Sequence, residues 1–222
     1  MKKNELLYHD LGVISFGEAY DFQNRMLETA VETKKKGEPV QNTVLFCEHP
    51  HVYTIGKSGD ENNLLVNDSF LSSIGASYCR TDRGGDITYH GPGQIVVYPI
   101  IDLDAWQIGT KEYIYRLEYL IIELIEMYGI KGEISNGNIG VWLDTGTTNE
   151  RKICSIGVKV SRGITMHGLA LNVCTDLSYF NHIHPCGYTD KTVTSIMKET
   201  GKEFELDEIK DRMRGLFGKH FL

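Results

Sequence analysis

The chain has 222 residues, of which 41% are hydrophobic and 24% are charged, a balance typical of a globular protein that can bury the core of one domain. Its formal net charge of −7 argues against a nucleic-acid-binding protein, which would normally carry a basic surface. No segment approaches the roughly 20 consecutive apolar residues of a membrane helix. The N-terminal lysines are not followed by the apolar run of a secretory signal, so we expect a cytoplasmic protein that binds neither membranes nor nucleic acids.

The first helix is predicted by its ends. Ser15 and Glu18 have the spacing of a capping box, and apolar side chains recur after them on one face, at Ala19, Phe22, Met26 and Ala30. The run 34–36 of three lysines followed by Gly37 is typical of a helix terminus, where cations favour the negative end of the dipole. We therefore interpret this lysine run as a solvated helix end rather than a binding patch.

Short strand-like runs follow at residues 43–47, 52–55, 77–80 and 94–101. A second helix is predicted over about 111–128, because apolar residues recur there at helical spacing and Gly129 can end it. Its predicted buried face consists of Ile114, Leu117, Ile121, Leu124, Ile125 and Tyr128.

Three more strands are predicted at 140–143, 152–160 and 167–173, and a last helix near 207–217. Strands in consecutive runs, separated by helices, indicate an α+β fold rather than a doubly wound sheet. The hairpin-like spacing around Arg162-Gly163 favours antiparallel pairing. We predict a single α+β domain over residues 1–222, with a largely antiparallel sheet and helices packed on it.

The five cysteines are widely spaced, at Cys47, Cys79, Cys154, Cys174 and Cys186. An odd number in a chain without a secretory signal indicates free thiols in a reducing compartment. Each of them could instead be a small buried hydrophobic residue. Cys186 lies between Pro185 and Gly187, and such a turn is a poor place for a core cysteine but a good one for an accessible nucleophile.

Residues 83–94, Arg-Gly-Gly-Asp-Ile-Thr-Tyr-His-Gly-Pro-Gly-Gln, are rich in glycine. Glycines let the backbone approach a ligand closely and present its N–H groups to oxygen atoms. The segment lacks the features of a P-loop and of a dinucleotide fingerprint. From composition alone, a glycine-rich turn between strands and a structural role for His90 are alternatives. Lys152, at the start of a predicted strand, could likewise be an ordinary exposed edge residue.

Three segments together resemble the lipoyl(octanoyl) transferase family. They are Arg83-Gly-Gly-x-x-Thr-Tyr-His90-Gly-Pro-Gly-Gln94; Lys152-x-x-Ser-x-Gly157 with His167-Gly-Leu-Ala-Leu-Asn172; and Pro185-Cys186-Gly187 with Val193-Thr194-Ser195. The resemblance implies the catalytic-domain fold that biotin and lipoate protein ligases share. It also implies transfer of octanoyl from acyl carrier protein to a lysine of lipoyl domains, in 2-oxoacid dehydrogenase complexes or in the glycine cleavage H protein, with no cofactor. We expect a monomer.

Carried over to this sequence, the resemblance makes Cys186 the nucleophile that holds the acyl group as a thioester and Lys152 its partner. It also implies an acyl pocket whose backbone N–H groups stabilise the oxyanion. Lys152 could favour the thiolate as a cation, or act as a base when neutral. The implied substrate-binding residues are Arg83, Gly84, Gly85, Asp86, Ile87, Thr88, Tyr89, His90, Ser155, Ile156, Gly157, Gly168, Leu169 and Ala170.

The acidic net charge conflicts with the acidic partners that the resemblance implies, so docking would need a local basic face. The candidates are Lys159, Arg162, Lys191 and Lys198, unless these are ordinary solvated charges.

Three other functions were weighed. An ATP-dependent lipoate protein ligase would need no nucleophilic cysteine and would carry an added C-terminal domain. A metal protein could use the clusters Cys47, His49 and His51 or His182, His184 and Cys186, although neither has the spacing of a common zinc site, and we predict no metal. A non-catalytic acyl-binding relative would not be expected to retain both Cys186 and Lys152.

Overall fold

The computed structural model describes residues 5–184 and 192–221 of the chain. Two residues singled out in the sequence, Cys186 and Lys191, lie outside the described residues, as do Pro185 and Gly187. Among the helices that the structure describes, none combines the length and apolar composition that crossing a bilayer would require.

The large sheet has the strand order β1-β2-β6-β10-β9-β8-β7, and β11 pairs with β9 outside this path. Its strands are β1 (Leu6–Val13), β2 (Asn42–Glu48), β6 (Gln94–Ile100), β7 (Glu133–Ser135), β8 (Asn138–Leu143), β9 (Arg151–Ser161), β10 (Ile164–Asn172) and β11 (Thr192–Val193). Within this sheet, only the pairs β1–β2 and β11–β9 are parallel among those described. The prediction of an α+β domain with a largely antiparallel sheet is therefore confirmed.

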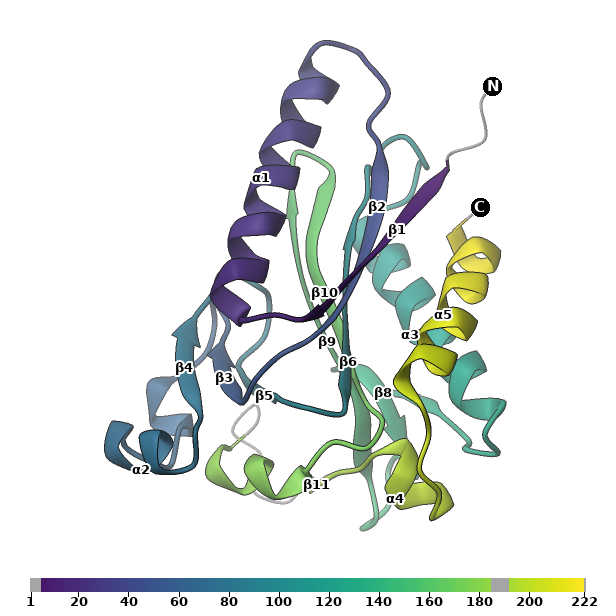
Figure 1. The fold of residues 1–222 in the computed structure, drawn as a ribbon. Helices are drawn as coiled ribbons and strands as arrows, with labels where there is room; N and C mark the ends of the chain where they lie inside the picture. The colour runs from purple at the N-terminus through teal and green to yellow at the C-terminus, as the bar shows by residue number, and fades with distance from the viewer. Residues whose placement is uncertain (1–4, 185–191, 222) are drawn as a thin grey trace.

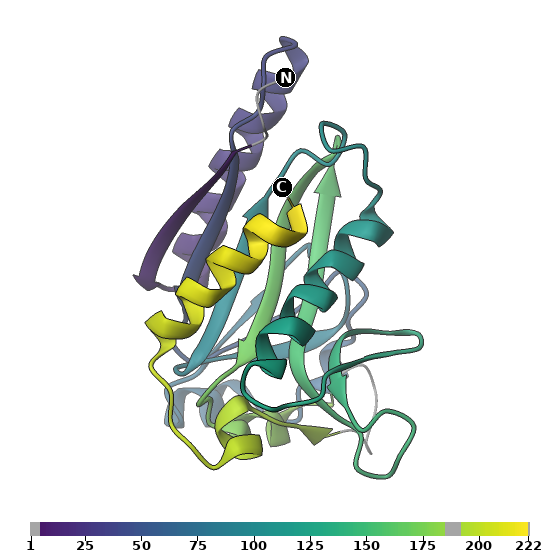
Figure 2. The same ribbon diagram turned by 90° about the vertical axis from the view of Figure 1, so that its right-hand side faces the viewer.

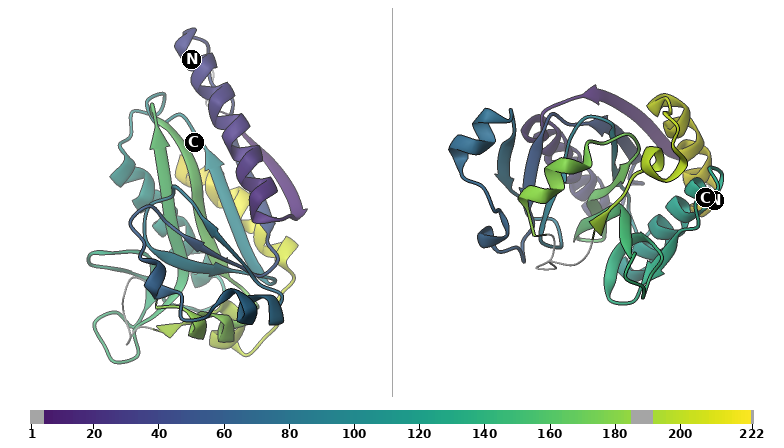
Figure 3. Two further views of the ribbon diagram at one scale, coloured as in Figure 1. Left: turned by 90° about the vertical axis from the view of Figure 1, so that its left-hand side faces the viewer. Right: turned by 90° about the horizontal axis from the view of Figure 1, so that it is seen from below.

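A second, smaller sheet has the order β4-β3-β5. Its strands are β3 (Val52–Ile55), β4 (Ser77–Arg80) and β5 (Ile87–His90). The short helix α2 (Asp68–Ser73) and the 3-10 turns η1 (Glu61–Asn63) and η2 (Leu177–His182) accompany it. Figure 3 shows this sheet crossing one end of the large sheet.

Helices cover both faces of the large sheet. α1 (Phe16–Lys35) lies on one face, whereas α3 (Thr110–Glu126) and α5 (Leu206–Phe221) lie on the other, where Figure 2 shows both helices along the strands. The short helix α4 (Ile196–Thr200) follows β11. One apolar cluster fills the space beneath α3 and α5, a second lies beneath α1, and a third belongs to the small sheet. The core is therefore layered, with the large sheet in the middle (Figure 1).

The first helix forms as predicted at both ends. The Ser15 side chain accepts a hydrogen bond from the backbone N–H of Glu18, and the Glu18 carboxylate accepts one from the N–H of Ser15. The helix ends at Lys35, and Gly37 follows with φ +73°. The lysine run is not simply solvated, however, because Lys34 Nζ lies 2.5 Å from Asp102 and 2.6 Å from Asp104. That prediction was wrong for Lys34, since the carboxylates that bind it are distant in sequence.

The hairpin predicted around Arg162-Gly163 is also confirmed. β9 and β10 pair antiparallel from Ser161↔Ile164 onward, and both turn residues have positive φ, 52° and 79°. This geometry joins twisted strands by a two-residue loop. The strands β1 and β5 were not predicted. β1 buries only Leu6, so it lacks an alternating pattern, and β5 lies inside the glycine-rich segment.

At Gly168, two neighbouring strands approach so closely that no side chain larger than a hydrogen atom fits between them. A Cβ atom built on it would lie 2.1 Å from the carbonyl oxygen of Val97 on β6. Gly168→Ala should therefore lower the free energy of unfolding by about 1–3 kcal/mol, because β6 and β10 must separate to admit the methyl group. Urea denaturation measures the change.

Gly215 provides the control, since a Cβ atom there would meet nothing within 4 Å. Gly215→Ala in α5 should stabilise the protein by up to about 1 kcal/mol, through helix propensity. Equal stabilities for the two variants would contradict the tight contact between β6 and β10.

Candidate active site

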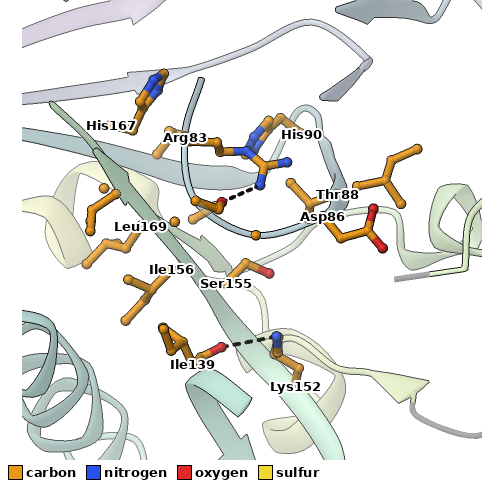
Figure 4. A pocket seen from close by; sticks show the side chains of 18 of the residues that line it. Arg83, Asp86, Thr88, His90, Ile139, Lys152, Ser155, Ile156, His167 and Leu169 are labelled. Carbon is orange, nitrogen blue, oxygen red and sulfur yellow. Dashed lines mark hydrogen bonds between the residues drawn. The ribbon is translucent and has the colours of Figure 1, made fainter. Parts of the chain in front are cut away.

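A cavity of about 510 Å³ lies where the loop 83–86 and β5 face β9 and β10. Its volume is in the range of small-molecule sites, roughly 300–1,000 Å³. Lys152 lines it together with nearly all of the predicted substrate-binding residues, namely Arg83, Gly84, Gly85, Asp86, Ile87, Thr88, His90, Ser155, Ile156, Gly157, Gly168, Leu169 and Ala170. Figure 4 shows many of these side chains around the cavity. The fold thus brings together residues that are up to 87 positions apart in sequence, from Arg83 to Ala170.

Tyr89 is the exception among the predicted lining residues. It is fully buried in the apolar cluster of the small sheet. Its hydroxyl lies 2.7 Å from Nδ1 of His51, and its ring stacks on Tyr179 at 4.9 Å between centroids. Because successive side chains of a strand point to opposite faces, Tyr89 faces the small sheet's own core while Thr88 and His90 line the cavity.

The loop that begins at Arg83 is held against β9. The buried Arg83 guanidinium donates to the carbonyl oxygen and hydroxyl of Thr54, at 2.6 Å and 3.0 Å. The N–H of Gly84 donates to the carbonyl of Val158 at 3.0 Å. A Cβ atom on Gly157 would lie 2.9 Å from the Gly84 carbonyl, so glycine is needed there for the loop to lie this close. The N–H of Gly84 is consequently used within the protein and is not the expected oxyanion donor.

A chain of buried hydrogen bonds joins the three sequence motifs. His90 Nδ1 lies 2.7 Å from Oε1 of Gln94, whose amide nitrogen donates to Oδ1 of Asn172 at 2.8 Å. The Asn172 amide donates to the carbonyl of Thr194 at 3.0 Å, and the N–H of Thr194 donates to the carbonyl of Lys152 at 2.9 Å. The segment after residue 191 is therefore fixed to the strand that carries Lys152.

His90 is neutral in this network. Burial lowers the pKa of His90 to about 3, because a charged imidazole loses its hydration there. Since the Gln94 oxygen can only accept, Nδ1 of His90 donates to it. Nε2 is then an acceptor and faces the Thr54 hydroxyl at 3.4 Å. The sequence left open whether His90 has a structural role or a role in the site. Its contacts are those of a structural residue, and its ring also lines the cavity.

Lys152 reaches the cavity because of an irregularity in the sheet. On β8 and β9, Val141 pairs with Cys154 but the next residue, Trp142, pairs with Lys152, so β9 has one extra residue, Ile153. Ile153 and Cys154 both enter the main core. The bulge resets the alternation of side chains and turns Lys152 to the side of the cavity. Its Nζ atom lies 4.4 Å from the centre of the Trp142 ring and donates to the carbonyl of Ile139 at 3.2 Å (Figure 4).

The chain on both sides of residues 185–191 is anchored. Upstream, the N–H of His184 donates to the carbonyl of Asn63 at 2.8 Å. Downstream, β11 pairs in parallel with β9, with Val193 opposite Lys152. Cys186 itself lies outside the described residues.

The remaining lining residues were not predicted. They are mainly apolar or aromatic and come from several elements, as Phe16, Val96, Tyr98, Ile114, Asn138, Ile139, Trp142, Val158, His167, Phe180, Thr192 and Val193. His167 and Val193 belong to segments that carried the family resemblance, whereas the others look locally like ordinary core or strand residues that no sequence pattern marks. His167 is unusual, with φ +58° inside β10 and Nε2 at 2.9 Å from Asp82. Burial lowers the pKa of His167 to about 4, so this ring is neutral near pH 7.

The described thiols are poor nucleophiles. Cys47 and Cys154 are buried, and Cys79 and Cys174 are partly buried. Desolvation raises the pKa of all four thiols, because burial disfavours the thiolate. Each of these four cysteines therefore fits the alternative of a small hydrophobic residue.

Two metal clusters were weighed as an alternative from the sequence. Within the part of the chain that the structure describes, no three His, Cys, Asp or Glu side chains could hold an ion. His49 contacts the carbonyl of Ile14 and the hydroxyl of Tyr98, both at 2.7 Å. The second cluster includes Cys186 and so lies partly outside the described residues.

The candidate basic face is not continuous. Arg162 lies at the hairpin turn, ten residues of extended β9 from Lys152, which is about 33 Å. It is therefore not a neighbour of Lys152, although Val158, four residues before it on β9, lines the cavity. Lys159 is paired with Asp82 at 2.5 Å. Lys198, exposed on α4, remains near the Lys152 end, and Lys191 is not described.

The chain matches known proteins over nearly its whole length. The family described as the lipoyl protein ligase A/B catalytic domain matches residues 19–218. The octanoyltransferase of Bacteroides thetaiotaomicron is 49% identical over 210 residues, which cover 95% of this chain and 92% of that protein. The octanoyltransferase of Parabacteroides distasonis is 48% identical over 215 residues, which cover 96% of this chain and 97% of that protein.

Among solved structures, a bi-partite lipoate protein ligase from Thermoplasma acidophilum is similar with a TM-score of 0.68 at 16% identity, covering 98% of this chain and 84% of that chain. This likeness confirms the expected fold. The family match and the two nearly full-length matches at close to half identity show that the chain belongs to the octanoyltransferases within the lipoyl protein ligase A/B catalytic-domain family.

Proposed function

We propose that this acyltransferase moves an octanoyl group from acyl carrier protein to a lysine of a lipoyl domain, through a thioester on Cys186 assisted by Lys152. The observation that carries the proposal is the pairing of Val193 with Lys152. It ties the chain that follows residues 185–191 to a lysine at the edge of a cavity. Relatives at 48–49% identity that are called octanoyltransferases support the choice of acyl group.

The cavity suits a medium-length hydrocarbon chain. Side chains such as Val96, Ile156, Leu169 and Ala170 line it, and the loop from Arg83, which is held by Thr54, forms one wall. Burial of each methylene group favours binding by about 0.8 kcal/mol. Lys152, with its ammonium group over Trp142, supplies the polar group that chemistry at the carboxyl end of the chain requires.

The proposed reaction has two balanced steps. In the first, the Cys186 thiolate attacks the carbonyl of the donor thioester, and the carrier thiolate leaves and takes up the proton that the Lys152 ammonium gives up, which leaves Lys152 neutral. In the second, the uncharged acceptor lysine attacks the Cys186 thioester, the thiolate leaves, and Lys152 accepts the proton that the amine loses. A lysine beside the thiol favours the thiolate as a cation and can accept a proton as an amine. Neither step needs a cofactor.

The proposed partners follow from this chemistry. The donor is octanoyl-acyl carrier protein, and the acceptors are lipoyl domains of 2-oxoacid dehydrogenase complexes or the glycine cleavage H protein. The exposed Lys198 near the Lys152 end is a candidate contact for an acidic partner.

The first experiment is intact-mass measurement after mixing the protein with octanoyl-acyl carrier protein. Wild type should gain the mass of one octanoyl group, and Cys186→Ala should gain none, since the variant has no thiol at that position. Equal gains would reject Cys186 as the nucleophile. Octanoate with ATP is the parallel arm, and acylation only in that arm would favour a ligase.

The state of the thiols leads to a second prediction. Iodoacetamide should alkylate Cys186 faster than Cys47, Cys79, Cys154 and Cys174, because burial raises the pKa of those four thiols and only the thiolate reacts. Peptide mapping against time gives the five rates. Uniform labelling would mean that Cys186 is not an activated thiol.

Lys152→Arg separates the two roles of the lysine. Arginine keeps the positive charge but cannot give up its proton, so acyl transfer to the lipoyl domain should fall roughly 10²–10⁴-fold in single-turnover assays started from the acylated enzyme. Formation of the thioester should fall less, because a cation still favours the thiolate. A fully active arginine variant would exclude Lys152 as the base.

A further inference from the structure

Glu118, on α3, carries a buried carboxylate that contacts β8 near Lys152. Glu118 belongs to the buried face of α3 and is 1% exposed. Its Oε1 atom accepts a hydrogen bond from the N–H of Gly140 at 3.0 Å. Its Oε2 atom is buried and has no hydrogen-bond partner within the described residues. An ionised carboxylate in such a place is costly unless a positive charge lies nearby.

Glu118 and Lys152 bind the two ends of one peptide group. The N–H of Gly140 and the carbonyl of Ile139 belong to the same peptide bond, and that carbonyl accepts a hydrogen bond from Lys152 Nζ at 3.2 Å. The order of atoms is therefore carboxylate, N–H, C=O, ammonium. A carboxylate on the N–H end polarises the peptide and makes its carbonyl oxygen a stronger acceptor, which favours a charged Lys152.

The sheet is built so that these contacts can form. Gly140 has φ +121°, and a Cβ atom there would lie 2.5 Å from the carbonyl of Cys154 and 3.5 Å from Cε of Lys152. Only glycine allows β8 to lie this close to β9 and to turn the N–H toward α3. The other buried charges among the described residues have ion-pair partners or several hydrogen bonds, as Asp102 has with Lys34 and Lys210 has with Asp10.

We propose that Glu118 is a positioning residue that serves as the counter-charge of Lys152, acting on its ammonium group through the peptide bond between Ile139 and Gly140. The catalytic consequence rests on the proposed function. If Lys152 accepts the proton of the incoming amine, an ionised Glu118 stabilises the cation that forms and makes Lys152 a stronger base.

Electrostatics supports the pairing. Burial raises the pKa of Glu118 above its ordinary value, and the Gly140 hydrogen bond and the charge of Lys152 offset part of that rise. Among the described residues, the neighbouring groups of Lys152 have partners of their own or are neutral. Arg151 is bound to Glu199 and Asp144, burial holds Cys154 as a thiol, and Glu150 accepts from Ser135. Of the acidic groups that the structure describes, Glu118 is the one linked to Lys152 through a single peptide group.

The test is the titration of Lys152 by NMR, with ¹³C-labelled lysine side chains and no substrate present. The Lys152 ε-carbon signal is assigned by its loss in Lys152→Arg. Glu118→Gln keeps an acceptor for the Gly140 N–H but removes the charge, so the pKa of Lys152 should fall by roughly one unit. Glu126→Gln, which removes an exposed charge from the same helix, should leave that pKa unchanged. An unchanged pKa in folded Glu118→Gln would overturn the proposal.

A reciprocal measurement covers the case in which Glu118→Gln does not fold. In Lys152→Met the pKa of Glu118, read from its carboxyl ¹³C signal, should rise, because linked charges affect each other equally. If the pKa of Glu118 does not rise, the proposal is overturned.

Both titrations are independent of Cys186, so a failure of this proposal can be distinguished from a failure of the thioester mechanism. In single-turnover acyl transfer, the acid limb of the pH profile should move to lower pH with the Lys152 pKa in Glu118→Gln, which a purely structural role would not cause.

Discussion

The site depends on a line of buried, uncharged hydrogen bonds from His90 through Gln94 and Asn172 to Thr194. A buried polar group that loses its partner costs about 1–3 kcal/mol, so each member of this line requires the next. The line connects β5, β6, β10 and the chain after residue 191, which are distant in sequence. It therefore fixes the relative positions of the three motifs without placing a net charge in the core.

Close backbone contacts at two glycines also hold the elements around the cavity together. Gly157 allows the loop from Arg83 to lie on β9, and Gly168 allows β10 to lie on β6. Between them they bound part of a cavity that larger aromatic and aliphatic side chains, such as Phe16, Trp142 and Leu169, also line. A hydrocarbon chain could be bound there by burial of apolar surface alone, while the polar chemistry is confined to the end that carries Lys152.

The fold alone does not decide between an acyl transferase and an ATP-dependent ligase, since a lipoate protein ligase shares it at 16% identity. The difference must come from the groups at the Lys152 end of the cavity. A lysine held over Trp142 and bound to a peptide that is polarised by Glu118 is suited to proton transfer. If its environment prevents loss of the proton, the same lysine can act only as a fixed charge, so the ionisation of Lys152 distinguishes the two roles proposed for it.

Several helix ends, turns and strands of this protein could be predicted from the sequence, because interactions between neighbouring residues determine them. The capping box at Ser15 and Glu18, the two-residue turn at Arg162-Gly163 and the strands 52–55 and 77–80 depend on neighbours along the chain. The three segments that contain Arg83, Lys152 and Cys186 carried the resemblance to the family to which the chain belongs. The tertiary structure decided the rest, because it depends on contacts between distant residues. Tyr89 lies in the core of the small sheet, Lys34 is bound by Asp102, and Arg162 lies at the hairpin turn, at the opposite end of β9 from Lys152. Lys152 faces the cavity because one extra residue in β9 resets the alternation of the side chains along that strand. In the sequence Glu118 resembles any polar residue of a helix. Its role depends on the hydrogen bond that it accepts from the N–H of Gly140 on β8.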